Sequence, residues 1–427
     1  MSGASGTTGT GVGTPPRLDV DRLLDDPQTR IIVCCGSGGV GKTTTAAALG
    51  VRAAERGRKA VVLTIDPARR LAQSMGIDSL DNTPRQVQGV RGPGGGELHA
   101  MMLDMKRTFD EIVEGHSDPE RAQAILANPF YQSLSAGFAG TQEYMAMEKL
   151  GQLRARDDWD LIIVDTPPSR SALDFLDAPG RLGSFLDGKF IRVLMAPAKV
   201  GGRAGMKFLN VGMSMMTGTL SKLMGASLLK DVQTFVAAMD TMFGGFRTRA
   251  DATFRLLQAP GTAFLVVAAP EPDALREAAY FVERLAAEKM PLAGLVLNRV
   301  HGSGADQLSA ERALAAAENL EEAGIVDQES GKAGLRDSSP AETEDSVETE
   351  DGVDSDADVD EITAGLLRLH AERMQVIARE QRTRDRFTSL HPEVAVSEVA
   401  ALPGDVHDLA GLRAIGERLA AGVPAGA

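Results

Sequence analysis

Residues Cys35-Gly36-Ser37-Gly38-Gly39-Val40-Gly41-Lys42-Thr43-Thr44 match the pattern GxxxxGK[ST]. An apolar run, Ile31–Cys35, precedes this stretch, and an alanine-rich run, Thr44–Leu49, follows it. This order predicts a buried parallel strand, a glycine-rich turn and a helix. Because glycine adopts backbone conformations closed to other residues, the turn can direct successive N–H groups at a phosphate at the helix N-terminus. The stretch therefore predicts a nucleoside triphosphate site.

Two side chains have separate roles in this prediction. Lys42 places a positive charge on the β- and γ-phosphate oxygens, and the Thr43 hydroxyl is a ligand for Mg²⁺. A glycine-rich turn that binds no nucleotide is the alternative, and the flanking strand and helix argue against it.

Length and composition frame the rest of the chain. A length of 427 residues fits either an elaborated α/β domain with an inserted subdomain or two domains. No apolar stretch reaches the ~18 residues of a membrane span, and no secretory signal opens the chain, so we expect a cytoplasmic protein without direct membrane insertion. The two cysteines, Cys34 and Cys35, are adjacent in the first strand, where they cannot pair with each other and are expected to be buried.

The negative charge is concentrated in one segment. Of the 59 acidic residues, twelve lie between Asp337 and Glu361, which contain no Lys or Arg. The remaining 47 acidic residues are nearly balanced by the 45 basic residues of the chain. The folded body is therefore nearly neutral, and no nucleic-acid partner is expected. We predict a disordered acidic insertion over about 327–361, serving as a spacer or a docking tail for a basic partner. Its aspartates imitate a calcium loop, but Val359 and Gly365 occupy positions that such a loop requires to be Gly and Glu.

Apolar runs recur along the chain and alternate with helical patterns. This alternation predicts an α/β fold, a P-loop NTPase with a mostly parallel, doubly wound sheet. Residues 1–16 are expected to be a disordered tail, residues 17–427 the ATPase domain, and the segments 105–156 and 182–258 an inserted α-helical subdomain. The further strands are predicted at 59–65, 98–102, 161–164, 263–268, 294–297 and 394–400.

Polar residues follow several of these strands. Ligands of such sheets bind at the carboxyl ends of the strands. Asp165 is expected to contact Mg²⁺ through its water shell, and Asp66 to orient or deprotonate the attacking water. Each aspartate taken alone also fits a turn or a helix cap. The residues expected at this edge are Ser37, Asp66, Asp165, Glu271 and Asn298.

These motifs resemble the deviant-Walker-A ATPases of the arsenite-pump (ArsA) and tail-anchored-protein-targeting type. The family pattern KGGVGKTT is similar to Ser37–Thr44, its switch I to Asp66-Pro67-Ala68, and its switch II to Asp165–Asp174. The resemblance extends from about Thr29 to Leu419. It implies ATP and Mg²⁺ as cofactors, a dimer, and catalysis by Asp66 and Lys42. The nucleotide contacts that it implies are Gly36, Ser37, Gly38, Gly39, Val40, Gly41, Lys42, Thr43, Thr44, Glu271, Asn298 and Pro403, with Asn298 and the loop of Pro403 near adenine.

Two positions depart from the family. The first lysine of the pattern, which in the family reaches across the dimer interface, is Ser37 here. We therefore hypothesise a pairing with a paralogue that retains the lysine, while a homodimer remains open. In switch II, Arg170-Ser171 replaces Gly-His, and Arg170 is either a substitute cation or a solvated side chain.

The resemblance also limits what the ATPase drives. The only cysteines lie in the first strand, which argues against arsenite binding, and the absence of CxxC argues against a zinc-clasped dimer. Methionines cluster over 195–242, which favours a groove for a hydrophobic client, or else a subdomain core. The alternative function is a slowly hydrolysing or non-hydrolysing, nucleotide-gated scaffold. A membrane positioner is not favoured, since Leu409–Ala421 carries only two bases.

Overall fold

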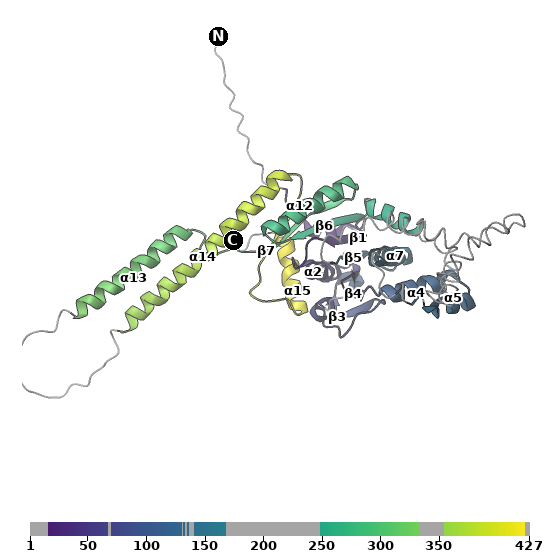
Figure 1. The fold of residues 1–427 in the computed structure, drawn as a ribbon, viewed down its shortest axis with the longest axis horizontal. Coiled ribbons are helices and arrows are strands. Elements are labelled where there is room, and N and C mark those ends of the chain that lie inside the picture. The colour runs from purple at the N-terminus through teal and green to yellow at the C-terminus, as the bar shows by residue number, and fades with distance from the viewer. Residues whose placement is uncertain are drawn as a thin grey trace, which may run out of the picture.

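A computed structural model of the chain describes residues 16–66, 70–129, 131–132, 135, 141–167, 248–332 and 354–422. In these residues the strands form one sheet in the order β3-β4-β2-β5-β1-β6-β7-β8, in which only β3 runs antiparallel to its neighbour (Figure 1). This confirms the predicted mostly parallel, doubly wound sheet. The strands are β1 (Ile31–Cys35), β2 (Lys59–Thr64), β3 (Arg85–Arg91), β4 (Glu97–Met102), β5 (Leu161–Asp165), β6 (Thr262–Ala268), β7 (Leu292–Val300) and β8 (Val396–Ala400).

Helices cover both faces of the sheet. Because successive strand residues point to opposite faces, the apolar strands contribute to two separate cores. One core includes α4 (Met105–His116), α7 (Thr141–Arg156) and α12 (Pro272–Ala287). The other includes α1 (Val20–Asp25), α2 (Lys42–Glu55) and α15 (Leu409–Ala421). Cys35 lies in the first core and Cys34 in the second, both buried and unpaired.

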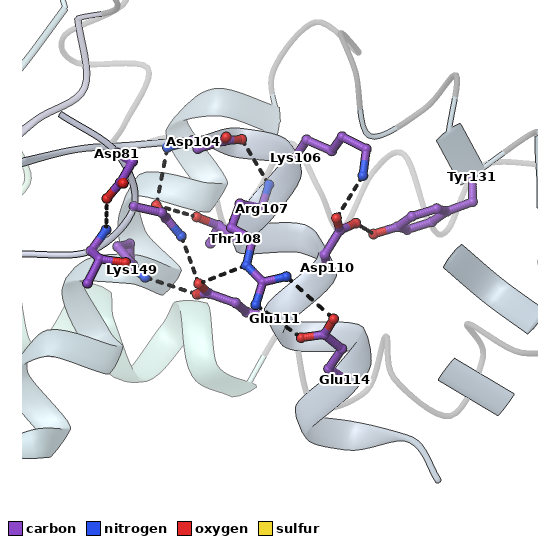
Figure 2. Close-up of polar contacts among 12 residues, drawn as sticks. Asp81, Asp104, Lys106, Arg107, Thr108, Asp110, Glu111, Glu114, Tyr131 and Lys149 are labelled. Atoms are coloured by element: carbon purple, nitrogen blue, oxygen red, sulfur yellow. Dashed lines mark hydrogen bonds and ion pairs between the residues drawn. The ribbon is translucent and has the colours of Figure 1, made fainter. Parts of the chain in front are cut away.

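The predicted helical segment 105–156 contains α4, α5 (Pro119–Leu126) and α7. Polar contacts hold α4 to its neighbours (Figure 2). Glu111 of α4 receives Lys149 Nζ of α7 at 2.9 Å and Asn82 Nδ2 at 3.2 Å. Lys149 is buried, and its ion pair with Glu111 satisfies a charge that would otherwise be costly to bury. Of the second predicted segment, 182–258, residues 248–258 form a helix, and the rest lies outside the described residues.

A helical arm projects from the body of the molecule (Figure 1). It consists of α13 (Ala310–Lys332) and α14 (Asp354–Leu390), which pack against each other through the buried residues Ala313, Ala317, Ala364 and Ala371. Composition predicted the segment 327–361 to be disordered. α13 extends into the beginning of this segment, and α14 starts before the segment ends. Acidic residues at the start of α14 favour a helix, because they complement the positive end of its dipole. Residues 333–353 lie outside the described part of the chain.

The sequence prediction also missed β3 and the short helix α3 (Arg70–Ser74). β3 is an edge strand with mostly exposed residues, so it lacks the apolar run that revealed the other strands. Among the described helices, none has both the length and the apolar character needed to cross a membrane.

Two glycines test how closely α2 packs on the sheet. A Cβ added at Gly50 of α2 would lie 2.6 Å from Val62 Cγ2 and 3.0 Å from Leu98 Cδ1, whereas one added at Gly115 of α4 would meet nothing within 4 Å. We expect Gly50→Ala to lower the free energy of unfolding by about 1–3 kcal/mol through overpacking. Gly115→Ala is the matched control and should raise it by up to about 1 kcal/mol. Urea denaturation measures both, and equal stabilisation by the two variants would contradict the packing argument.

Candidate functional site

The glycine-rich loop between β1 and α2 is shaped by the ends of two other strands. Gly36 has a φ of +150°, and a Cβ there would lie 2.0 Å from the carbonyl oxygen of Val267 in β6. Gly41, at the N-cap of α2, has a φ of +96°, and a Cβ there would lie 2.3 Å from Asn298 Nδ2 of β7. Only glycine therefore fits at these two positions. The backbone path of the loop is imposed by β6 and β7.

Lys42 lies at the first position of α2 with its side chain turned back towards the loop. Its ammonium group donates a hydrogen bond of 2.7 Å to the backbone carbonyl of Ser37, and the residue is only 6% exposed. Burial lowers the pKa of Lys42, while the nearby Asp165 carboxylate opposes this shift. The loop thus holds a buried cation against its own backbone.

Asp165 is the centre of the polar contacts at this edge. It ends β5 and is fully buried, and its Oδ2 accepts hydrogen bonds of 2.8 Å from both Thr43 Oγ1 and Thr64 Oγ1. Its Oδ1 has no hydrogen-bond partner among the described residues. Burial raises the pKa of Asp165 to about 6, although the two hydroxyl donors act in the opposite direction.

These oxygens suit Mg²⁺. Hydroxyl and carboxylate groups are the ligands that this ion accepts in proteins, together with several waters. The unpaired, buried Oδ1 of Asp165 is the kind of acceptor that a metal-bound water satisfies. The residues present therefore fit the predicted ion, with Thr43 and Asp165 as the groups nearest to it.

Asp66 follows β2 and lies near the same cluster. Its backbone N–H donates to Thr64 Oγ1 at 3.2 Å, so Thr64 joins the Asp66 backbone to the Asp165 carboxylate. The side chain of Gln142 in α7 donates to the carbonyl of Ile65 at 2.9 Å. The sequence prediction did not name Thr64 or Gln142, although a hydroxyl residue two positions before a strand-end aspartate is a usable signal. Of the predicted switch segments, Pro67, Ala68 and residues 168–174, which include Arg170 and Ser171, lie outside the described part of the chain.

A cavity of about 500 Å³ adjoins the loop on the side of β7 and β8. Gly41, Thr44, Asn298 and Pro403, all named from the sequence, line it together. Asn298 Nδ2 donates to the carbonyl of Val40 at 2.8 Å, which ties the end of β7 to the loop. Glu271 does not line this cavity and is exposed at the N-cap of α12.

Several lining residues were not predicted, among them Arg299 and His301. Arg299 has a φ of +61° at an irregularity between β7 and β8, and His301 follows the end of β7. Both line the cavity. His301 Nδ1 contacts Glu380 Oε1 of α14 at 2.6 Å, and the His301 backbone N–H donates to Glu380 Oε2 at 3.0 Å. The loop after β7 is therefore attached to the arm.

The family described as the anion-transporting ATPase (ArsA) matches this chain over residues 29–323. The chain belongs to this family. The match spans β1 to β7 and the greater part of α13, so it includes the glycine-rich loop, Asp66, Asp165 and Asn298. The resemblance inferred from the motifs is confirmed. Pro403 lies beyond the matched residues.

Individual relatives in the anion-transporting ATPase family are distant. The chain is 30% identical over 176 residues to "ATPase GET3" of Malassezia globosa, which covers 41% of this chain and 50% of that protein. It is 25% identical over 299 residues to "ATPase GET3" of Podospora anserina, covering 68% and 80%. It is 23% identical over 286 residues to "ATPase ASNA1 homolog 2" of Paramecium tetraurelia, covering 65% and 78%.

Asp165→Asn tests the burial of the central carboxylate. Because the folded-state pKa of Asp165 is raised, the folded chain binds more protons than the unfolded chain between about pH 4 and pH 6, so its carboxylate lowers stability as pH rises through that window. We expect the nucleotide-free variant to exceed wild type in unfolding free energy by on the order of 2 kcal/mol at pH 7.5, and by little at pH 4. Urea denaturation across this range measures the difference. Exposed Asp158→Asn is the control, and a difference independent of pH would contradict the argument.

Proposed function

We propose that this chain is a Mg²⁺-dependent ATPase that works as a dimer and couples ATP binding and hydrolysis to a hydrophobic client. The observation that carries the proposal is the convergence of Lys42, Thr43 and the buried Asp165 at the carboxyl edge of the sheet, beside a cavity. Phosphoryl transfer needs mainly positioning and charge at that place, and these residues can supply both.

The phosphate end of the site is assigned to the loop. The N–H groups of Gly36 to Thr44 bind the phosphates, and Lys42 exchanges the Ser37 carbonyl for a phosphate oxygen. Thr43 and Asp165 hold Mg²⁺, Asp165 through the water shell of the ion. When bound, Mg²⁺ neutralises charge on the phosphate oxygens.

Asp66 is assigned to the attacking water. It lies next to Thr64, and the hydrogen bond from Thr64 to Asp165 couples its backbone to the metal side of the site. In this position its carboxylate orients the water and accepts its proton. The adenine is assigned to the cavity, near Asn298 and Pro403. Glu271 is proposed as a nucleotide contact from the resemblance alone, since it lies outside that cavity.

The dimer is proposed to be asymmetric. Position 37 carries no cation, so a paralogous subunit that retains the lysine would supply it in trans, and the homodimer stands as the alternative. The proposed client groove falls on the methionines of 195–242, which lie outside the described residues. A cytoplasmic location is part of this proposal.

Steady-state ATP hydrolysis, measured with the chain alone and with a co-purifying paralogue, tests the proposal. We expect turnover to require the partner, and Asp66→Asn to lower it by about 10²-fold or more while ATP binding persists. A rate that no partner changes would contradict the asymmetric pairing. Tight ATP binding without turnover in either setting would instead support the nucleotide-gated scaffold.

Ser37→Lys provides a direct test of the missing cation. Lys42 bonds the backbone carbonyl of Ser37, so this substitution leaves that hydrogen bond in place. We expect the variant alone to hydrolyse ATP at least about tenfold faster than wild type alone, because two copies can then exchange the lysine. Ser37→Met, which has similar length and no charge, is the control. Equal rates for the Lys and Met variants would rule out a role of the charge.

A further inference from the structure

The arm carries an apolar stripe that nothing in the described structure covers. Val359, Ile362, Leu366 and Leu369 of α14 are 57%, 63%, 61% and 63% exposed. They recur at intervals of three, four and three residues, which places them along one side of the helix and is the spacing of a coiled-coil seam. α14 therefore has a second apolar side, in addition to the side that packs against α13.

This stripe lies on a different side of α14 from its contact with α13. The contact with α13 uses the small, buried side chains of Ala364 and Ala371. At 100° per residue, Leu366 is rotated by about 200° from Ala364 and faces away from α13. The stripe is thus available to a helix that approaches from outside the arm.

The stripe ends where α14 meets the body of the molecule. Arg373 continues the same spacing, but its Nε donates to the carbonyl of Gly302 at 2.7 Å, and Glu380 binds His301. The four exposed apolar residues therefore belong only to the projecting part of the arm (Figure 1). In that position the stripe faces no other element among the described residues.

We propose that the stripe pairs in antiparallel orientation with the same stripe of a second copy of this chain. The charge pattern of α14 selects this occupant. Over residues 354–361 the sequence has five acids and no base, whereas over 367–374, which an antiparallel pairing about residue 364 brings opposite them, it has two arginines and one acid. Parallel pairing would bring the acidic ends together, while antiparallel pairing brings each acidic end to a basic one.

One antiparallel register aligns the apolar residues of the two copies. If the two-fold axis passes the helix at residue 364, Val359 lies opposite Leu369 of the second copy, and Ile362 lies opposite its Leu366.

The pairing is expected to be weak for one arm alone. Four side chains per copy provide less area than the ~800 Å² per partner of a stable interface. Association is therefore expected at high protein concentration, or when another contact already holds the copies together.

Disulfide trapping tests the orientation. The two native cysteines are buried, so Val359→Cys and Leu369→Cys each add one exposed thiol to the full chain. In the proposed register, position 359 meets position 369, whereas each position lies about 15 Å from its own equivalent. We expect a mixture of the two variants, without nucleotide and with a mild oxidant, to give a mixed disulfide dimer, and neither variant alone to do so. Dimers of the Val359→Cys chain with itself, or no dimers at all, would overturn the proposal.

Sedimentation velocity of the nucleotide-free chain gives the second test. We expect Ile362→Asp to weaken self-association by about tenfold or more. Tyr280→Asp, which alters an apolar residue of α12 that is 53% exposed, should leave it unchanged. A wild-type chain that stays monomeric, together with a Val359→Cys variant whose thiol resists alkylation, would place another segment of the same chain on the stripe and would overturn the proposal. Because neither test uses ATP, their failure leaves the proposed ATPase function untouched.

Discussion

The site depends on the burial of one carboxylate. Asp165 is fully buried, yet among the described residues only one of its oxygens has hydrogen-bond partners, the hydroxyls of Thr43 in α2 and of Thr64 at the end of β2. An anion in this position is unfavourable unless a cation approaches it. The chain thus folds around a buried carboxylate that favours a positive partner. Lys42 is a nearby cation, and the oxygens of the site also suit a metal ion. The negative charge of Asp165 that suits a bound cation therefore lowers the stability of the folded chain when no cation is bound.

Much of the central sheet could be predicted because its central strands are continuous apolar runs, several of them followed by a polar residue. The same logic located Asp66, Asp165 and Asn298 at one edge. The sequence did not predict a role for Thr64, because that role depends on a hydrogen bond to Asp165, which is 101 positions away in the chain. Glu271 shows the reverse case, because a strand-end position alone does not bring a side chain into the cavity.

The arm and the edge strand were harder to predict for a different reason. α14 combines an acidic start with an arginine-rich end, so composition suggested disorder over its beginning. Its partner helix supplies alanines, which carry little hydrophobic signal although they permit close packing. β3 exposes most of its residues and is recognisable only through its pairing with β4. In each case the stabilising contact is distant in the sequence.

Because α14 is attached to the body beside the cavity, a small rotation at this attachment moves the far end of the helix by a larger distance. His301 and Gly302 contact α14 through Glu380 and Arg373. About 20 residues of α14 extend from this attachment to Asp354. At 1.5 Å per residue that length is about 30 Å. A rotation of α14 by about 10° at this attachment displaces its N-terminal end by about 5 Å. A rotation too small to alter the sheet therefore produces a larger movement at the far end of the arm.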